Sequence, residues 1–163
     1  MHVTNRVIEM VAAERKDAFD VVCAFQVLEH VPDVAAFLRS AIEVLRVGGK
    51  LIIGVPNSNP FLFKYDRLHA LNLPPHHMGL WDKESLAALA SVFPLRLVGI
   101  RVEPLFDAGY FVEVYQRHIR KTRPTLSRVL DKWPERGRGY VYKLLQRVVE
   151  GRNLHAVFEK RAA

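Results

Sequence analysis

Two apolar runs joined by an amphipathic segment constrain the fold of this chain more than any other feature. The first run is FDVVCAF, residues 19–25, and the second is LIIGVP, residues 51–56. Continuous apolar runs of this length predict strands that are buried on both faces of a parallel sheet. Between them, apolar residues recur at intervals of three and four over residues 34–45, which predicts a helix that Asp33 caps and Gly48 ends. Strand, helix and strand in this order form a βαβ unit, whose strands are parallel neighbours.

The rest of the chain extends this unit into an α/β domain. The pattern predicts a capped helix at residues 82–93, a strand at 95–105, a helical insert at 106–151 and a last strand at 153–160. At 163 residues, of which 50% are hydrophobic, the chain is large enough for one hydrophobic core. We therefore expect a single domain, residues 1–163, with a mostly parallel sheet, flanking helices and a basic helical insert before the last strand.

The positive charge of the chain is concentrated in its C-terminal part. The net charge is +7, and from Arg117 onward there are 13 Lys or Arg against 4 Asp or Glu. Such a segment can contact nucleic acid, an acidic substrate or an anionic membrane surface, or it can be a set of solvated helix faces. Helical spacing of the apolar residues favours solvated helix faces, and the lack of an aromatic and basic stacking pattern disfavours nucleic acid as a partner.

Other features restrict the class of protein. Cys23 is the only cysteine, so no disulfide can form within the chain and a cysteine-based zinc site is excluded. No apolar run reaches the roughly 18 residues of a membrane-spanning helix, and the start MHVTNRVIEM lacks the basic and then apolar pattern of a signal peptide. We expect a cytoplasmic protein without a membrane span.

Polar residues that can bind a ligand or take part in catalysis follow the first predicted strand. Gln26, Glu29 and His30 come directly after it, at the carboxyl end where open α/β sheets bind ligands. A long irregular segment, residues 57–81, follows the second strand and contains the pair His76 and His77. Long loops inside compact domains are usually functional, so we expect this segment to take part in a site.

Three stretches resemble one enzyme family. FDVVCAFQVLEHVPDVAAFLRSAIEVLRVGGKLIIGVPN, residues 19–57, is similar to the central segment of class I S-adenosylmethionine-dependent methyltransferases, from their fourth strand to their fifth. PPHHMGLWDKESLAALASVF, residues 74–93, resembles the next loop and helix in the branch related to ubiquinone-pathway O-methyltransferases. NLHAVFEKRA, residues 153–162, resembles the last strand of that branch.

The resemblance implies a partial Rossmann-like fold. The family has a sheet of order 3-2-1-4-5-7-6, and this chain contains stretches equivalent to strands 4-5-7-6. No glycine precedes Gly48, so the glycine-rich turn that binds the cofactor in the family is absent from the sequence. We interpret the chain as the C-terminal portion of such an enzyme, or as a chain without its cofactor half. Its expected partner is then a missing N-terminal half or a second copy.

The resemblance also implies roles for particular residues. It places Ala24, Phe25 and Gln26 at the methionine end of S-adenosylmethionine, whose methyl group passes in line to an oxygen or nitrogen of a small-molecule or nucleotide-like acceptor. Glu29, His30 and His77 are then catalytic candidates, with His30 as the base for a hydroxyl acceptor because an unperturbed histidine titrates at about 6.5.

A metal site is a more specific hypothesis for the same residues. Glu29, His30 and one of His76 or His77, of which we choose His77, have side chains that suit a divalent cation. Some small-RNA 2′-O-methyltransferases carry a similar Glu-x-x-Glu-His with a distant histidine, but Gln26 replaces the first acid here. The alternative is a pair, Glu29 and His30, that hydrogen-bonds neighbouring loops, with solvent-facing histidines after the prolines.

Three functions remain open from the sequence. The first is the C-terminal part of a methyltransferase, which the acid and histidines favour. The second is a non-catalytic subunit or pairing module of that fold, which the missing glycine turn favours. The third is a basic RNA-binding module, against which the ordinary apolar helix faces of the insert argue.

Overall fold

The computed structural model describes residues 3–58, 73–105, 108–125 and 146–162, together with positions 128, 140, 143 and 144. Its elements follow in chain order: α1 (Ile8–Ala12), β1 (Phe19–Phe25), the 3-10 turn η1 (Leu28–His30), α2 (Val34–Val44), β2 (Leu45–Pro56), α4 (Lys83–Val92), β3 (Leu95–Pro104), α5 (Ala108–Thr122) and β4 (Glu150–Lys160).

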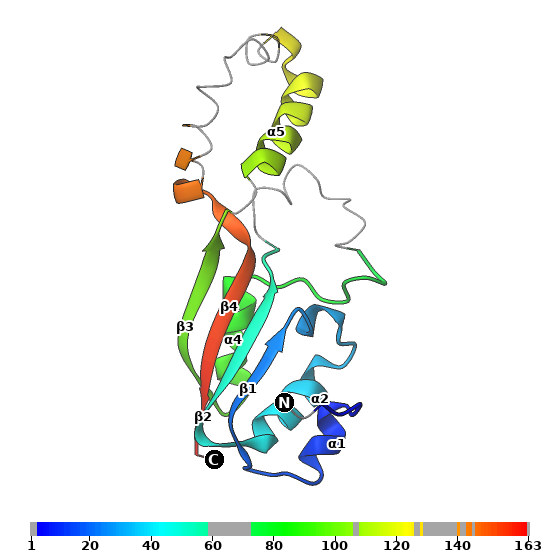
Figure 1. The fold of residues 1–163 in the computed structure, drawn as a ribbon, viewed down its shortest axis with the longest axis vertical. Coiled ribbons are helices and arrows are strands. Elements are labelled where there is room, and N and C mark those ends of the chain that lie inside the picture. Colours follow the sequence, from blue (N-terminus) through cyan, green and yellow to red (C-terminus); the bar gives the residue numbers. More distant parts are fainter. Residues whose placement is uncertain are drawn as a thin grey trace.

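The strands form one sheet of order β1-β2-β4-β3 (Figure 1). β1 and β2 are parallel, as a βαβ unit requires, and β4 runs antiparallel to both of its neighbours. Three of the four strands in the described part of the chain therefore share one direction. The predicted α/β class and the predicted order 4-5-7-6 are both confirmed.

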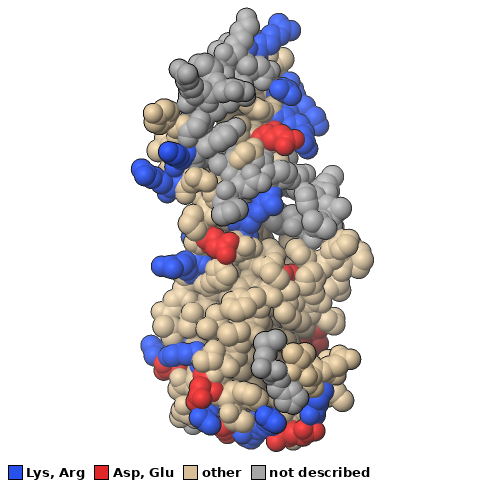
Figure 2. Space-filling view, viewed as in Figure 1, with Lys and Arg blue, Asp and Glu red and all other residues tan. Residues whose placement is uncertain are grey.

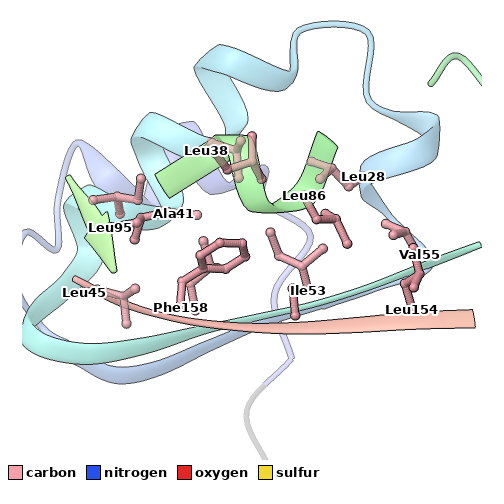
Figure 3. Close-up of a cluster of buried hydrophobic side chains, with 14 residues drawn as sticks. Leu28, Leu38, Ala41, Leu45, Ile53, Val55, Leu86, Leu95, Leu154 and Phe158 are labelled. Atoms are coloured by element: carbon pink, nitrogen blue, oxygen red, sulfur yellow. The ribbon is translucent and has the colours of Figure 1, made fainter. Parts of the chain in front are cut away.

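The helices α2 and α4 cover one face of the sheet. Alternate residues of β2 and β4 point to this face and are fully buried, including Ile53, Leu154 and Phe158. Leu38 from α2 and Leu86 from α4 meet them from the other side, as the edge-on view of the sheet shows (Figure 3). Side chains of a strand alternate between the two faces, so this core accounts for every second residue of β2 and β4.

The opposite face carries no helix in the described part of the chain. Val21 and Phe25 of β1 are 49% and 53% exposed on it, and Figure 2, drawn from the same side as Figure 1, shows a largely uncharged surface over the sheet. The prediction that β1 is buried on both faces is therefore wrong for these residues. An apolar run predicts burial of both faces only if both layers of helices are present, and here α2 and α4 supply one layer.

The predicted helix, which starts at Val34 and continues until Gly48 stops it, is too long, although its start is correct. Asp33 accepts a hydrogen bond from the backbone N–H of Ala36 at 2.9 Å, as an N-cap does. The helix ends at Val44, and Leu45 already pairs with Phe19 of β1. Pairing with β1 thus begins at Leu45, three residues before Gly48, and Gly48 instead has a positive φ of 81° within β2.

The predictions of the second helix and of the last strand are likewise correct in their central residues and differ from the structure at the ends. Asp82 caps α4 through a capping box with Ser85, as the sequence predicts. β4 begins at Glu150, three residues before the predicted start. A Cβ on Gly151 would lie 2.5 Å from the carbonyl oxygen of Glu103, so only glycine allows the two backbones to approach this closely at the start of β4.

The predicted insert contains the helix α5. Val114 and Ile119 of this helix are buried, while Arg117 and Arg120 are exposed. Figure 1 shows α5 beyond the end of the strands rather than over a face of the sheet, and Figure 2 shows basic side chains gathered there. Most of residues 126–145 lies outside the described residues, so further helices in the insert stay a prediction.

An ion-pair network ties the strands together at the end of the sheet opposite to the insert. Glu159 of β4 accepts hydrogen bonds from Lys50 of β2 and pairs with Arg96 of β3, whose Nη2 lies 2.9 Å from Oε1. These two cations, Lys50 first, lower the pKa of Glu159 from 4.5 to about 2. The folded state therefore binds this proton less readily than the unfolded chain.

We expect the contribution of Glu159 to stability to depend on pH. Because the pKa is lowered on folding, the contribution is complete above about pH 4.5 and is lost as the pH falls towards about 2. Urea denaturation of the wild type and of Glu159→Gln should therefore differ at pH 6 and converge at pH 2. A difference that is constant over this range would contradict the network.

Candidate active site

Three segments that are far apart in the sequence converge at the carboxyl ends of β1 and β2. Asn57, just after β2, forms an isolated bridge with Trp81, and the N–H of Ser58 donates to the carbonyl of Trp81 at 2.7 Å. Asn57 also donates its own N–H to the carbonyl of Arg152 at 2.6 Å. The start of β4 and the segment 73–81 are thus held beside the end of β2.

The turn after β1 presents two of its three predicted cofactor residues to solvent. Ala24 is buried in the sheet, whereas Phe25 and Gln26 are exposed. Gln26 has a φ of 53°, in the left-handed region that non-glycine residues rarely adopt, and its N–H donates to the carbonyl of Gly54 at 2.8 Å. Such conformations often occur at ligand-binding turns, where the surrounding structure compensates for their strain.

Glu29 is a buried carboxylate without a hydrogen bond. It lies in η1, its exposed fraction is 1%, and neither side-chain oxygen has a hydrogen-bond partner within the described residues. Its backbone carbonyl accepts hydrogen bonds from the N–H groups of Met78 and Gly79 at 2.7 and 3.1 Å. This pair of bonds fixes the segment that follows the prolines against η1.

The two histidines His30 and His77 lie beside this carboxylate. Their ring centroids are 5.0 Å apart, and Nε2 of His30 is 3.7 Å from Oε1 of Glu29. Nδ1 of His30 contacts the carbonyl oxygen of His76 and must donate to it, so that in the neutral imidazole the lone pair is on Nε2. One ligand atom from each of Glu29, His30 and His77 lies within 4.8 Å of the others.

The environment of His77 keeps its imidazole neutral. Burial lowers the pKa of His77, and the charges of His30 and His76 lower it further, while Glu29 acts in the opposite direction. A neutral imidazole can accept a proton or bind a cation. The structure thus brings together the three residues that the sequence singles out, and His77 rather than His76 completes the group. Gln26 lies outside it, because its amide contacts Asn153 at 3.4 Å.

Sequence reasoning missed a second polar group at the same end of the sheet. Glu103 at the end of β3 contacts Asn153 and His155 of β4. His155 follows the polar and apolar alternation of its strand, and Glu103 stands just before a proline, so neither carries a motif. Only the antiparallel register of β3 and β4 brings Glu103 and His155 together, and no local pattern in the sequence predicts that register.

Comparison with known proteins identifies the family. Residues 2–98 match a family model described as a methyltransferase domain. The chain is 31% identical over 124 residues to a ubiquinone biosynthesis O-methyltransferase of Marinobacter nauticus, covering 68% of this chain and 52% of that protein. It is 41% identical over 56 residues to the protein of the same name from Xanthomonas oryzae pv. oryzae, covering 34% of this chain and 23% of that protein. The chain thus spans about half or less of these relatives.

Solved structures agree on the fold. A SAM dependent methyltransferase from Archaeoglobus fulgidus superimposes with a TM-score of 0.58 at 14% identity, covering 97% of this chain and 66% of that one. A SAM-dependent methyltransferase from Thermotoga maritima gives a TM-score of 0.54 at 16% identity, covering 90% and 58%. The family model, which matches more than half of the chain, shows that the chain belongs to the class I S-adenosylmethionine-dependent methyltransferase family, and its sequence relatives make it similar to the ubiquinone O-methyltransferases.

Proposed function

We propose that the chain is the C-terminal part of an S-adenosylmethionine-dependent methyltransferase that transfers a methyl group to an oxygen or nitrogen acceptor. The observation that carries this proposal is the meeting of Glu29, His30 and His77 beside the exposed turn of Phe25 and Gln26. All of these residues lie at the carboxyl ends of parallel strands, where open α/β sheets bind ligands.

S-adenosylmethionine supplies an activated methyl group that is bound to a positively charged sulfur. The residues present fit one wall of its site, since the left-handed backbone at Gln26 turns the chain away from β1 and leaves the ring of Phe25 open to a ligand. We assign Ala24, Phe25 and Gln26 to the methionine end of the cofactor. Positioning of the acceptor would then supply most of the catalysis, with a base needed only for a hydroxyl.

We further propose that Glu29, His30 and His77 hold a divalent cation. The fit is supported by a buried carboxyl group without a hydrogen bond next to two imidazoles, because a buried polar group without a partner is costly. Two nitrogen ligands favour Mn²⁺ over Mg²⁺, which prefers oxygen. A bound cation would polarise an acceptor oxygen and lower its pKa. Without a cation, Nε2 of His30 is the candidate base.

The acceptor in this proposal is a small molecule or a nucleotide-like compound. The names of the matched relatives specify O-methylation in ubiquinone biosynthesis, which supports a hydroxyl acceptor for this chain as well. None of the helices in the described part of the chain is long and apolar enough to cross a membrane. A cytoplasmic location stays a prediction.

A second candidate function is a non-catalytic subunit or pairing module of the same fold. Two observations support it: the sequence has no glycine before Gly48, and β1 is an edge strand with exposed apolar side chains in the described part of the chain. In this case the partner is an N-terminal half on another chain or a second copy of this chain.

The 163-residue chain by itself is expected to bind S-adenosylmethionine weakly or not at all. The turn after β1 forms one wall of the site, but no glycine-rich turn precedes β1 in this sequence to bind the rest of the cofactor. Titration calorimetry measures this directly. A micromolar dissociation constant would show that the chain holds a complete cofactor site and would remove the main support for the pairing module.

The decisive test of the enzyme itself is turnover by the longest in-frame product of the gene. The sequence directly upstream of Met1 should encode a glycine-rich strand, turn and helix, and that product should release S-adenosylhomocysteine when candidate acceptors are added. Loss of release in His30→Ala would support the proposed site. An upstream region without such a motif, together with no turnover, would favour the pairing module.

A further inference from the structure

A second polar group lies on the uncovered face of the sheet, next to the turn after β1. Nε2 of His155 is 2.8 Å from Oε1 of Glu103, and Nδ2 of Asn153 is 2.7 Å from Oε2 of the same carboxylate. Nε2 of Gln26 reaches Oδ1 of Asn153 at 3.4 Å. These contacts connect β3, β4 and the turn that carries Phe25, and they involve none of the three proposed metal ligands.

The hydrogen bonds in this group determine where the proton of the imidazole sits. Both oxygens of Glu103 accept, from His155 and from Asn153, and these two bonds lower the pKa of Glu103, so its carboxylate is ionised at neutral pH. An ionised carboxylate cannot donate, so Nε2 of His155 must carry the proton. In the neutral imidazole the lone pair is therefore on Nδ1, which makes no hydrogen bond within the described residues.

A glycine leaves room for this nitrogen beside the turn. A Cβ on Gly54 would lie 2.7 Å from Cδ1 of Phe25 and 3.1 Å from Nδ1 of His155. Without that Cβ, the two rings meet edge to face over β2 with their centroids 6.2 Å apart. The His155 side chain is 33% exposed, so the imidazole is open to solvent next to an exposed aromatic ring.

We propose that His155 is a general base of the site and that Glu103 is its positioning residue. The arrangement is that of a histidine whose tautomer is set by a carboxylate on one nitrogen while the other nitrogen faces the reacting group. This role rests on the proposed methyl transfer, because it places the base beside Phe25 and Gln26, which we assign to the cofactor. It adds a proton acceptor that is independent of His30.

The proposed step balances in charge and atoms. The O–H bond of a hydroxyl acceptor breaks and its proton goes to Nδ1 of His155. The oxygen forms a bond to the methyl carbon of S-adenosylmethionine, and the carbon–sulfur bond breaks with its electron pair left on sulfur. One positive charge thus leaves the sulfonium and one appears on the imidazolium, where the carboxylate of Glu103 stabilises it.

The first test measures the tautomer of His155 and does not require enzymatic turnover. Long-range ¹⁵N–¹H correlation spectra of the labelled chain, with His155→Gln to assign the signals, should show the proton on Nε2 at neutral pH. Iodomethane, used as a methyl donor in a Cys23→Ser background, should then methylate His155 on Nδ1. Glu103→Ala should abolish the tautomer preference and the selective methylation.

The matched control is Glu150→Ala. Glu150 lies on β4, the strand of His155, and pairs with Lys83 rather than with His155. Its removal changes the net charge by the same amount as Glu103→Ala and should leave the tautomer of His155 unchanged. A proton on Nδ1, or methylation on Nε2, in the wild type would overturn the proposal. In any product of the gene that turns over, His155→Gln should lower kcat about a hundredfold with the KM for S-adenosylmethionine unchanged, and an unchanged kcat would equally overturn it.

These results separate the two proposals. Absence of cofactor binding and turnover in every product of the gene, with methylation still on Nδ1, would count against the methyltransferase function alone. Cofactor binding and turnover together with an unselective His155 would count against this base alone.

Discussion

Millimolar Mn²⁺ is expected to raise the melting temperature of the chain, and the rise should be absent from Glu29→Ala and His77→Ala. A cation that binds only the folded state stabilises it by about 2.7 kcal/mol when its free concentration is 100 times the dissociation constant. For a chain of this size each kcal/mol corresponds to roughly 2–4 °C, so the shift should be about 5–10 °C. Differential scanning fluorimetry with and without metal measures it.

Without a metal, the side chain of Glu29 is expected to destabilise the folded chain. Glu29 is buried and its oxygens have no hydrogen-bond partner within the described residues, and a buried unsatisfied polar group costs about 1–3 kcal/mol. Glu29→Met, which keeps an unbranched side chain of similar length, should therefore stabilise the metal-free chain and remove its response to Mn²⁺. A structural carboxylate would instead give a destabilised variant.

The matched control for the metal is His76→Ala. His76 contacts His30 through its backbone carbonyl, which the substitution keeps, and its side chain is not part of the group of three ligands. This variant should retain the full shift. If millimolar Mn²⁺ leaves the melting temperature of the wild type unchanged, the proposed cation site is excluded.

The isolated chain is expected to associate through the edge strand β1. Within the described part of the chain β1 has a neighbour on one side only, and its outer backbone groups can pair with another strand. Val21 and Phe25 add exposed apolar surface, and β1 contains neither proline nor lysine to oppose pairing. We therefore expect a dimer or a larger assembly by size-exclusion chromatography with light scattering.

Val21→Lys should convert this assembly to monomers. Val21 is 49% exposed on the uncovered face, whereas its neighbour Val22 packs against the core, so a lysine at position 22 would disturb folding as well as pairing. Val92→Lys, at a 72% exposed position on α4, is the control and should leave the assembly unchanged. The edge needs no partner if the wild type is a monodisperse monomer whose β1 amides exchange rapidly with solvent.

The local features of the fold were predictable from the sequence. β1 occupies the residues that its apolar run predicts, and Asp33 and Asp82 cap their helices as expected. These features depend on neighbours within about one turn or one strand, where periodicity and capping preferences are strong. The end of α2 was not predictable, because pairing of Leu45 with β1 competes with helix propensity there and depends on a distant strand.

Some features of the candidate site were likewise predictable from the sequence, and others were not. The sequence by itself determined that Glu29 and His30 follow a strand at the carboxyl edge of the sheet, because the order of elements sets that position. Only the tertiary structure decided that Glu29 is buried and that His77 rather than His76 joins it, through the hydrogen bonds of Met78 and Gly79 to η1. Burial and contacts between segments more than 40 residues apart arise from long-range packing and strand register, which no local pattern encodes.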